Sequence, residues 1–553
     1  MQILNVAQMR AWEQAADAAG HTYAQMMELA GQGVARALLK RHTLKGRRAL
    51  VLVGPGNNGG DGLVTARYLT EAGGNVTAYL SRARDPQTDA VYQRALERKV
   101  AVVLATDDSE QSELRQLVTH THFLIDALLG TGATPPLTGT IADILRTARK
   151  TLAERPHLLT TLNAPAIRPP RPIIVAVDGP SGLDFDTGAL DPLALPAHLT
   201  VTFAAPKWGH FRFPGGGHCG ELVVAEIGIP ASVTPPAAGP TVATPQQVAA
   251  WLPTRAADAH KGTFGRALIV AGSANYTGAA ALAAQAAVRS GAGLVTLALA
   301  SSLHSAIAPL VPEATYLLLP HALGALTANA HPLLADRYAT YDALLVGPGL
   351  GQAPETEQFI QALLGAPLTK RNAGFLAQAP AASAPPSLPP LVIDADGLNL
   401  LAKLPEWPTR LPAESILTPH PGELARLTEL STAEIQADRL GYAQRCATEW
   451  GQTLVLKGAF TIVAAPDGRT SVLPFANAAL ATAGTGDVLA GAIVALRAQG
   501  LPPFEAAVAG AYLHGLAGEL ARQRHGVAGV AAGDVALALG EAGLSLHPTF
   551  GGH

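Results

Sequence analysis

The chain has very little cysteine, few aromatic residues and few charged residues for its length. Only Cys219 and Cys446 occur among 553 residues, and their spacing fits neither a disulfide framework nor a zinc site. Charged residues make up 15% with a net charge of −3, so we expect no nucleic-acid partner. No run of about 20 apolar residues occurs, which argues against a membrane-spanning helix.

Hydrophobic residues are abundant instead, at 48% of the chain. Single hydrophobic cores rarely grow past about 250–300 residues, so this length predicts more than one globular domain. The first 20 residues contain acidic side chains and no long apolar segment, unlike a secretory signal peptide. We therefore expect a cytoplasmic protein without a membrane partner.

A segment rich in proline, alanine and threonine divides the chain into two halves. We place an interdomain linker at 233–246, between domains at 1–232 and 247–545. In both halves, short apolar runs alternate with helical segments, which predicts three-layer α/β domains that bind ligands at the carboxyl ends of parallel strands. The expected strands are 49–53, 122–128, 173–178, 266–272, 343–349, 391–396, 415–420 and 453–458. Stretches 155–172 and 378–390 are predicted surface insertions.

Polar side chains follow three predicted strands of the first half. Residues 57–61, NNGGD, follow the first strand, although Asn-Gly and Asp-Gly pairs also serve as ordinary turns. Asp126 closes the second strand, where a buried charge is costly unless it is paired or bound to a cation. Ser181 and Asp178 follow the third. Oxygen ligands with few formal charges suit K⁺ better than Mg²⁺, which leaves Asp178 for proton chemistry.

Residues 484–487, GTGD, precede an apolar segment with helical spacing in the second half. Glycines let backbone N–H groups approach a phosphate, and the positive end of the helix points at the same place. A carboxylate there, Asp487, can take a proton from a hydroxyl while a phosphoryl group moves onto it. The alternative is that Asp487 is an ordinary N-cap.

Other loops of the second half also carry polar or small residues. Gly278 and Ala279 leave room for a flat ligand, although close helix–sheet packing would require the same residues. His420 lies between two prolines, which favours a ligand contact over a place in the core. Lys457 lies in a turn between two strands, where it can meet a phosphate or be a solvated hairpin lysine.

The first half resembles the YjeF N-terminal family, the NAD(P)H-hydrate epimerases, over about residues 3–230. This resemblance implies that Asn58, Asp126 and Ser181 hold K⁺. It also implies that Asp178 is the acid/base that interconverts the R and S epimers of NADHX and NADPHX. The residues implied in binding this substrate, besides Asp178, are Asn57, Asn58, Gly59, Gly60, Asp61, Gly130, Thr131, Gly132, Ala133, Thr134, Pro135 and Pro136.

The second half resembles the YjeF C-terminal family, the NAD(P)H-hydrate dehydratases, which have a ribokinase-like fold. The resemblance spans about residues 247–540 and rests on the motifs HKG-x-x-G, AGSANYTGAA, GPGLG, DADGLN, TPHPGE, LKGAFT and AGTGD. It implies that the hydrate contacts Ala279, Gly349, His420 and the catalytic Asp487. The implied nucleotide contacts are Lys457, Gly458, Ala459, Phe460, Thr461 and Gly486.

Together these resemblances imply a bifunctional repair enzyme that uses ADP and releases AMP and phosphate. Mg²⁺ is expected at the nucleotide, with Asp394, Asp396 and Glu423 as unranked ligand candidates, and the family suggests a homo-oligomer. One alternative is a ribokinase-like small-molecule kinase fused to a nucleotide-binding domain. Another is a non-enzymatic sensing module, which the intact set of oxygen ligands disfavours.

Overall fold

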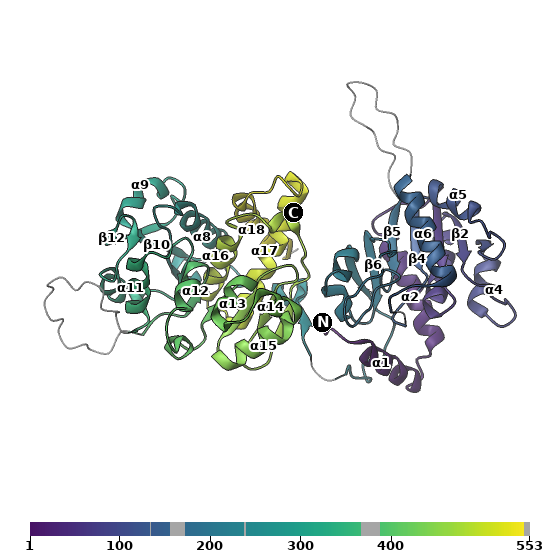
Figure 1. Ribbon diagram of the computed structural model, residues 1–553, viewed down its shortest axis with the longest axis horizontal. Helices are drawn as coiled ribbons and strands as arrows, with labels where there is room; N and C mark the ends of the chain where they lie inside the picture. Colours follow the sequence, from purple (N-terminus) through teal and green to yellow (C-terminus); the bar gives the residue numbers. More distant parts are fainter. Residues whose placement is uncertain (133, 155–171, 237–238, 367–386, 547–553) are drawn as a thin grey trace, which may run out of the picture. The chain divides into compact units, whose positions relative to one another are not determined.

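The computed structural model describes residues 1–132, 134–154, 172–236, 239–366 and 387–546. The chain divides into two compact units, Gln2–Gly239 and Pro240–His553 with Met1 (Figure 1). Strand β8 (Thr241–Val242) and the start of helix α7 (Pro245–Trp251) fall within the predicted linker and belong to the second unit. The predicted insertions at 155–172 and 378–390 lie mostly outside the described residues.

The first unit is built on a seven-stranded parallel sheet with the order β3-β2-β1-β4-β5-β6-β7. Its strands are β1 (Arg48–Val53), β2 (Asn75–Leu80), β3 (Ala101–Leu104), β4 (Phe123–Ala127), β5 (Ile173–Val177), β6 (Leu199–Phe203) and β7 (Glu221–Ala225). Its helices are α1 (Val6–Ala18), α2 (Tyr23–Leu39), α3 (Asn57–Glu71), α4 (Ala90–Glu97), α5 (Ser112–His120) and α6 (Gly139–Glu154), with short 3₁₀ turns η1 (Trp208–Phe211) and η2 (Gly215–His218).

Alternation along β1 explains the three layers of this unit. Val51 and Val53 join a core cluster with residues of α2 and α3 on one face of the sheet. Leu50 and Leu52 join a second cluster with residues of α5 and α6 on the other face. Because successive side chains of a strand point to opposite faces, one apolar run serves both layers.

The second unit contains a ten-stranded sheet with the order β11-β10-β9-β14-β15-β16-β17-β18-β19-β8. Only the β17–β18 and β18–β19 pairs are antiparallel. The remaining strands are β9 (Arg266–Val270), β10 (Leu294–Ala300), β11 (Thr315–Leu319), β14 (Ala343–Val346), β15 (Leu391–Ile393), β16 (Ile416–Leu417), β17 (Thr453–Leu456), β18 (Ile462–Ala464) and β19 (Thr470–Val472). A separate hairpin pairs β12 (His321–Ala322) with β13 (Ala325–Leu326).

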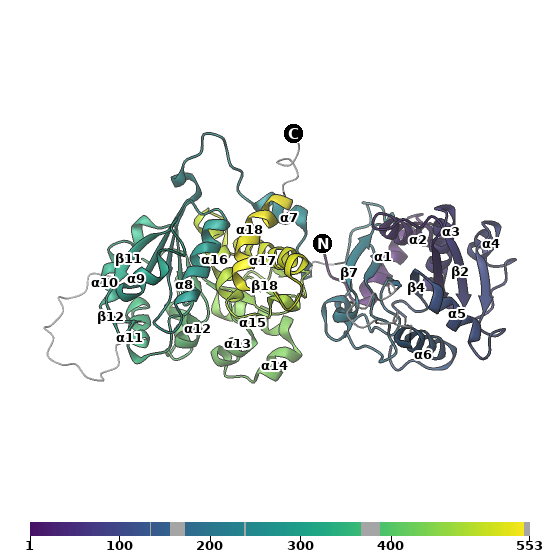
Figure 2. The same cartoon turned by 90° about the horizontal axis from the view of Figure 1, so that it is seen from above.

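Helices flank this second sheet (Figure 2). Four of them, α8 (Thr277–Arg289), α16 (Thr485–Ala498), α17 (Pro503–His525) and α18 (Ala532–Leu546), pack against one another. Besides α7, the others are α9 (His304–Ile307), α10 (Ala330–Ala335), α11 (Pro354–Leu363), α12 (Asp396–Leu401), α13 (Pro421–Thr428), α14 (Thr432–Ala437) and α15 (Arg439–Trp450), with 3₁₀ turns η3 (Lys261–Phe264), η4 (Ser301–Leu303), η5 (Tyr338–Thr340), η6 (Trp407–Arg410) and η7 (Ala478–Leu480).

All eight expected strands are present, and the α/β class is confirmed for both units. Several strands end earlier than expected; β15 ends at Ile393 and β16 at Leu417. The polar residues that follow, Asp394 and Thr418, still donate one backbone hydrogen bond each to the neighbouring strand and stand at the carboxyl edge of the sheet, where ligands bind in such folds. Among the described residues, no helix combines the length and the apolar character needed to cross a membrane.

Candidate active sites

The NNGGD segment forms the first turns of helix α3, whereas the sequence suggested a turn before the helix. Gly56 is the N-cap and Asn57 is the first helical residue. A Cβ atom on Gly59 would lie 2.0 Å from the Gly54 carbonyl oxygen, so only glycine permits this close approach. The helix can therefore begin directly at the carboxyl end of β1.

Asp126 and Ser181 are joined by two hydrogen bonds at the ends of β4 and β5. The Ser181 hydroxyl donates to Asp126 Oδ1 at 2.6 Å, and its N–H donates to Oδ2 at 2.8 Å. Burial raises the pKa of Asp126, although the Ser181 hydrogen bonds oppose this shift. Among the described residues, no basic side chain forms an ion pair with Asp126. A bound cation could supply the missing charge.

Asn58 lies beside the predicted substrate segment 130–136. Its Oδ1 is 3.2 Å from the position of a Cβ on Gly130, and its Nδ2 is buried without a hydrogen-bond partner. The Leu129 N–H donates to Ser181 Oγ at 2.9 Å. These contacts bring the three predicted K⁺ ligands into one region. Ala133 lies outside the described residues, and of its neighbours, Thr131 accepts a hydrogen bond from Arg10 through its carbonyl.

Asp178 forms a buried ion pair that the sequence did not predict. Lys207 Nζ lies 2.7 Å from Asp178 Oδ1, and the Thr202 hydroxyl donates to the same oxygen at 2.8 Å. Lys207 is only 1% exposed. Burial alone would raise the pKa of Asp178, but the Lys207 ammonium, together with His210 and the Thr202 hydrogen bond, outweighs this effect and the pKa is lowered. Asp178 is therefore ionised at neutral pH.

The backbone of Asp178 is held in the left-handed region, with φ of 65°. His210 supports this conformation. Its Nδ1 accepts from the Lys207 N–H at 3.0 Å, so its Nε2 carries the proton and donates to the Asp178 carbonyl at 2.9 Å. Burial lowers the pKa of His210 to about 4, which keeps the ring neutral. Strained backbone of this kind is concentrated at functional sites.

A second carboxyl near Asp178 has the opposite protonation tendency. Burial raises the pKa of Asp61 well above its usual value, and the charges of Asp178 and Glu13 raise it further. Burial also raises the pKa of Glu13, against the opposing charge of Lys207. A neutral acid beside an ionised base is the arrangement that acid/base catalysis requires.

In the second unit, Asp487 stands in the first turn of helix α16. Gly484 is the N-cap, and no side chain caps the helix, so the N-cap interpretation of Asp487 is wrong. Within the described chain, the N–H groups of Gly486 and Asp487 have no hydrogen-bond acceptor. Burial raises the pKa of Asp487 to about 7, helped by Asp394 and opposed by Lys457.

Lys457 is an ion-paired residue, and its interpretation as a solvated hairpin lysine is wrong. Its Nζ lies 2.5 Å from Asp394 Oδ1 and 3.4 Å from Glu423 Oε2. Asp394 Oδ2 is buried without a hydrogen-bond partner, and it lies 4.0 Å from the position of a Cβ on Gly486. The LKGAFT turn and the GTGD motif therefore meet at Asp394.

His420 has a structural task as well as an accessible ring. It is the N-cap of α13, and its Nδ1 accepts from the Gly422 N–H at 2.9 Å. Glu423 completes the capping box by accepting from the His420 N–H at 2.7 Å. The imidazole side chain is 52% exposed, so it is not part of the core. Burial lowers its pKa, which favours the neutral ring at pH 7.

Ala279 and Gly349 are neighbours at the carboxyl edge of the sheet. A Cβ on Gly349, which has φ of 61°, would lie 2.7 Å from Ala279 Cβ. A Cβ on Gly278 would meet nothing within 4 Å, so close packing does not explain that glycine. Asp396 accepts from the Gly351 N–H at 2.9 Å and fixes the same loop.

Two further residues beside the second site escaped the sequence analysis. His514, on α17, hydrogen-bonds the Thr485 backbone, and its Nε2 is buried without a partner. Burial lowers its pKa to about 4. Arg439, at the start of α15, contacts the LKGAFT turn. Neither residue lies in a motif that identifies its role, because both reach the site through tertiary packing.

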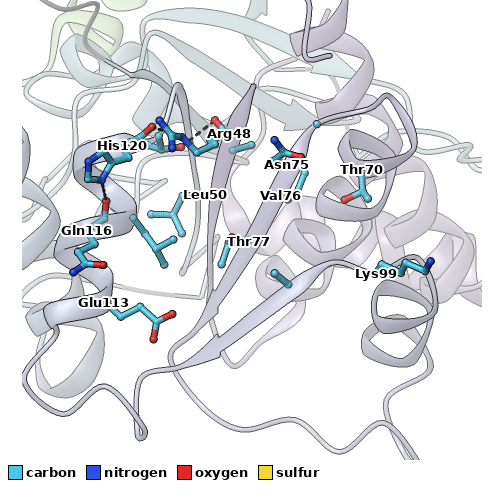
Figure 3. Close-up of a pocket in the computed structure, with 15 residues that line it drawn as sticks. Arg48, Leu50, Thr70, Asn75, Val76, Thr77, Lys99, Glu113, Gln116 and His120 are labelled. Carbon is cyan, nitrogen blue, oxygen red and sulfur yellow. Dashed lines mark hydrogen bonds between the residues drawn. The ribbon is translucent and has the colours of Figure 1, made fainter. Parts of the chain in front are cut away.

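None of these site residues lines the surface hollow of about 630 Å³ in the first unit. Figure 3 shows the residues that line it, among them Arg48, Asn75 and His120. It is formed at the amino ends of β1 and β2, where Arg48 Nε donates to the His120 carbonyl at 3.0 Å. Asp126 and Asp178 stand at the opposite, carboxyl edge of the same sheet. Their position agrees with the general location of ligand sites in parallel sheets.

Comparison with known proteins identifies the family. A family model described as YjeF-related protein N-terminus matches residues 23–209, and one described as NAD(P)H-hydrate dehydratase matches residues 267–539. The bifunctional NAD(P)H-hydrate repair enzyme Nnr of Moorella thermoacetica is 38% identical, covering 92% of this chain and 90% of its own length. The corresponding protein of Thermofilum pendens is 35% identical, and the match covers 91% of this chain and 89% of that protein.

Among solved structures, an ADP/ATP-dependent NAD(P)H-hydrate dehydratase from Bacillus subtilis, co-crystallised with ATP and Mg²⁺, is 33% identical. It covers 56% of this chain and 100% of its own, with a TM-score of 0.46. The similarity to the Moorella and Thermofilum proteins extends over both halves and confirms the resemblances found in the sequence. The chain belongs to the family of bifunctional NAD(P)H-hydrate repair enzymes, with an epimerase domain followed by a dehydratase domain.

Proposed function

We propose that the second unit dehydrates the S epimer of NADHX or NADPHX with ADP as co-substrate. The observation that carries this proposal is Asp487, a carboxyl with a pKa of about 7 among the free N–H groups at the start of α16. Near neutral pH such a group can accept a proton, whereas a carboxylate with the usual pKa is a weaker base. The N–H groups beside it can stabilise the oxygens of a phosphoryl group.

The reaction is then a transfer followed by an elimination. Asp487 takes the proton of the C6 hydroxyl as that oxygen attacks the terminal phosphorus of ADP, and AMP leaves. The phosphate then leaves C6 with the bonding electrons, assisted by the ring nitrogen. Loss of a proton from C5 restores the double bond of NADH or NADPH. A leaving phosphate makes the elimination easier than a leaving hydroxide.

The nucleotide is proposed to bind at residues 457–461 and Gly486, and the substrate at Ala279, Gly349, His420 and Asp487. Contacts through Asp394 support this grouping, because Asp394 touches Lys457 and lies next to Gly486.

The residues around Asp394 fit a proposed Mg²⁺ ion whose ligands would come from both the protein and the nucleotide phosphates. Within the described ranges, no three His, Cys, Asp or Glu side chains are placed to hold a metal by themselves. Asp394 Oδ2 is buried and unpartnered, and Mg²⁺ is usually held by one or two carboxylates together with substrate phosphates. Asp394 is therefore the preferred ligand, ahead of Asp396 and Glu423. The ion would neutralise charge on the phosphates.

We propose that the first unit interconverts the two epimers at C6. Asp61, as the neutral acid, protonates the departing hydroxyl, and water leaves a cationic ring. Asp178, as the ionised base, takes a proton from the water that adds to the opposite face. Asn58, Asp126 and Ser181 would hold K⁺, because no basic side chain of the described residues pairs with Asp126, and the ion would supply positive charge beside the bound substrate. The cytoplasmic location and homo-oligomeric state stay predictions.

An Asp487→Asn variant tests the dehydratase proposal. Turnover of the hydrate should fall by about 10²-fold or more, because the amide cannot accept the proton. Affinity for ADP, measured by calorimetry, should change little. Near-normal turnover would contradict the proposal, and an accumulating phosphorylated substrate in the wild-type reaction would favour the kinase alternative.

A further inference from the structure

Arg439 holds the turn between β17 and β18 through three backbone carbonyls. Its Nη1 donates to the Ala459 oxygen at 2.6 Å, and its Nη2 donates to the Leu456 and Lys457 oxygens, each at 3.3 Å. The Nε atom of the same side chain is buried without a hydrogen-bond partner. One side chain from the start of α15 therefore fixes most of the LKGAFT turn.

The guanidinium of Arg439 carries a charge that no carboxylate of the described residues neutralises. In the part of the chain that the structure describes, Arg439 forms no ion pair, and the neighbouring Asp438 pairs with Arg445 instead. Burial lowers the pKa of Arg439 to about 10, so the group is still charged at neutral pH. Carbonyl oxygens stabilise this charge only partly. Lys457, on the same turn, pairs with Asp394 and Glu423, so Arg439 is the cation of this turn that is left to interact with the phosphates of a ligand.

The contact with the Lys457 carbonyl also determines the direction of the next N–H group. In a planar trans peptide, the C=O of one residue and the N–H of the following residue point in opposite directions. Because the Lys457 oxygen faces Arg439, the Gly458 N–H faces away from it. That N–H has no acceptor among the described residues. It is therefore available to a ligand.

Gly458 itself is adapted to this arrangement. Its φ is 140°, a conformation that residues with a side chain rarely adopt. A Cβ atom at this position would also lie 2.9 Å from Arg439 Nη2. Gly458 and Arg439 thus depend on each other, and substitution of either one should release the turn.

We propose that Arg439 is a positioning residue of the nucleotide site. It turns the Lys457–Gly458 peptide so that its N–H faces the phosphates of the bound nucleotide, and it places a positive charge behind them. This inference rests on the proposed binding of ADP at residues 457–461. Arg439 acts through the turn and does not touch the reacting atoms.

The test compares Arg439→Met and Arg439→Lys with the wild-type full-length chain. Arg445→Met is the matched control, because Arg445 lies on the same helix with its side chain 51% exposed. We expect the KM for ADP to rise about tenfold or more in Arg439→Met, as the loss of charged hydrogen bonds implies. The KM for the hydrate should stay within about twofold of wild type. Arg445→Met should behave as wild type.

The conservative variant separates orientation from charge. A lysine ammonium is a compact point charge that cannot span three carbonyls as the planar guanidinium does, so Arg439→Lys should recover little affinity for ADP. Gly458→Ala should raise the KM for ADP in the same way. Full recovery in Arg439→Lys would overturn the orienting role.

Two further results would also overturn the inference. One is an unchanged KM for ADP in Arg439→Met. The other is an equal rise in the KM values for ADP and hydrate together with a lower unfolding temperature, which indicates a merely structural residue. Calorimetry with ADP on the wild-type chain keeps the two proposals apart. Absence of ADP binding there would contradict the proposed function itself, whereas equal binding by wild type and Arg439→Met contradicts only the role of Arg439.

Discussion

At the scale of single residues, Asp487 is subject to two opposing influences. The positive end of α16 favours a carboxylate in the first turn of the helix. Burial and the charges of Asp394, Asp396 and Glu423 favour the neutral acid, and they prevail, because the pKa is raised to about 7. Asp487 is therefore suited to accept a proton near pH 7, and its ionisation costs free energy in the folded state.

This balance predicts the pH dependence of dehydration. Asp487 must be ionised to act as a base, so kcat/KM for the hydrate should be low at pH 5, rise through about pH 7 and level off above it. Initial rates from pH 5 to 9, at saturating ADP, test this. A rate that stays constant between pH 5 and 7 would exclude Asp487 as the base.

The same shift has a consequence for stability. The folded state binds the Asp487 proton more tightly than the unfolded chain, whose pKa for this group is 3.8, so this stabilisation is lost as the pH rises towards 7. Asp487→Asn has no charge to bury. The unfolding temperature of Asp487→Asn minus that of wild type should therefore be larger at pH 8 than at pH 5. This gain would accompany the loss of activity.

In the first unit, the Lys207–Asp178 pair provides a further prediction. Lys207→Met removes the ammonium that pairs with the buried Asp178, and removal of one partner of a buried ion pair costs about 3–5 kcal/mol of the free energy of unfolding. Epimerisation should be lost, while dehydration of the S epimer should be unchanged. Lys207→Met/Asp178→Asn should recover most of the stability in calorimetric melts. A single variant as stable as wild type would argue against the ion pair.

At the scale of elements, the start of α16 depends on a glycine in the left-handed region of backbone conformation. Gly484 has φ of 91°, and a Cβ there would lie 2.7 Å from Leu282 Cδ1. Gly484→Ala should lower the free energy of unfolding by about 2–4 kcal/mol, because left-handed strain and overpacking add together. It should also weaken ADP binding.

Gly500→Ala is the matched control for Gly484→Ala. Gly500, just beyond the end of the same helix, has φ of 92° with nothing within 4 Å of the added Cβ. Gly500→Ala should lower the free energy of unfolding by only about 1–2 kcal/mol and leave ADP binding unchanged. Equal effects of the two substitutions on stability and binding would show that the crowding at Gly484 has no importance.

The strands that end in site residues could be predicted because their signals are local, whereas the interior strands β2 and β6 were not among the expected strands. An apolar run that stops at Asp126 or Asp178 is visible in a few residues of sequence. Strands at the edges were harder to predict: β3 (Ala101–Leu104) is only partly buried, and β8 (Thr241–Val242) is two residues long. β8 exists only because it pairs with β19, which lies far along the chain.

The partners of the catalytic carboxyls could not be predicted for a similar reason. Lys207 lies 29 residues after Asp178, and Lys457 lies 63 residues after Asp394. Spacing in the sequence does not reveal which strand ends lie side by side. The motifs indicated which segments form each site, whereas the ion pairs, and with them the protonation states, became visible only in the folded chain.

At the scale of the whole molecule, each proposed active site is built within one unit. We therefore expect two full-length variants to complement each other in solution. Asp178→Asn alone should rapidly consume only the S epimer of a mixed hydrate preparation. Addition of Asp487→Asn, which keeps the epimerase site, should restore rapid consumption of the R epimer. If the mixture of variants consumes no more of the R epimer than Asp178→Asn alone, both sites must act within one chain.

The central claim is that dehydration proceeds through transfer of a phosphoryl group to the C6 hydroxyl. The most direct test incubates the wild-type chain with hydrate, ADP, Mg²⁺ and K⁺, and measures reduced nicotinamide by absorbance and AMP and phosphate by chromatography. The account predicts that one AMP and one phosphate appear for each molecule of NADH or NADPH restored. Restoration of the reduced cofactor without any cleavage of the nucleotide would contradict it.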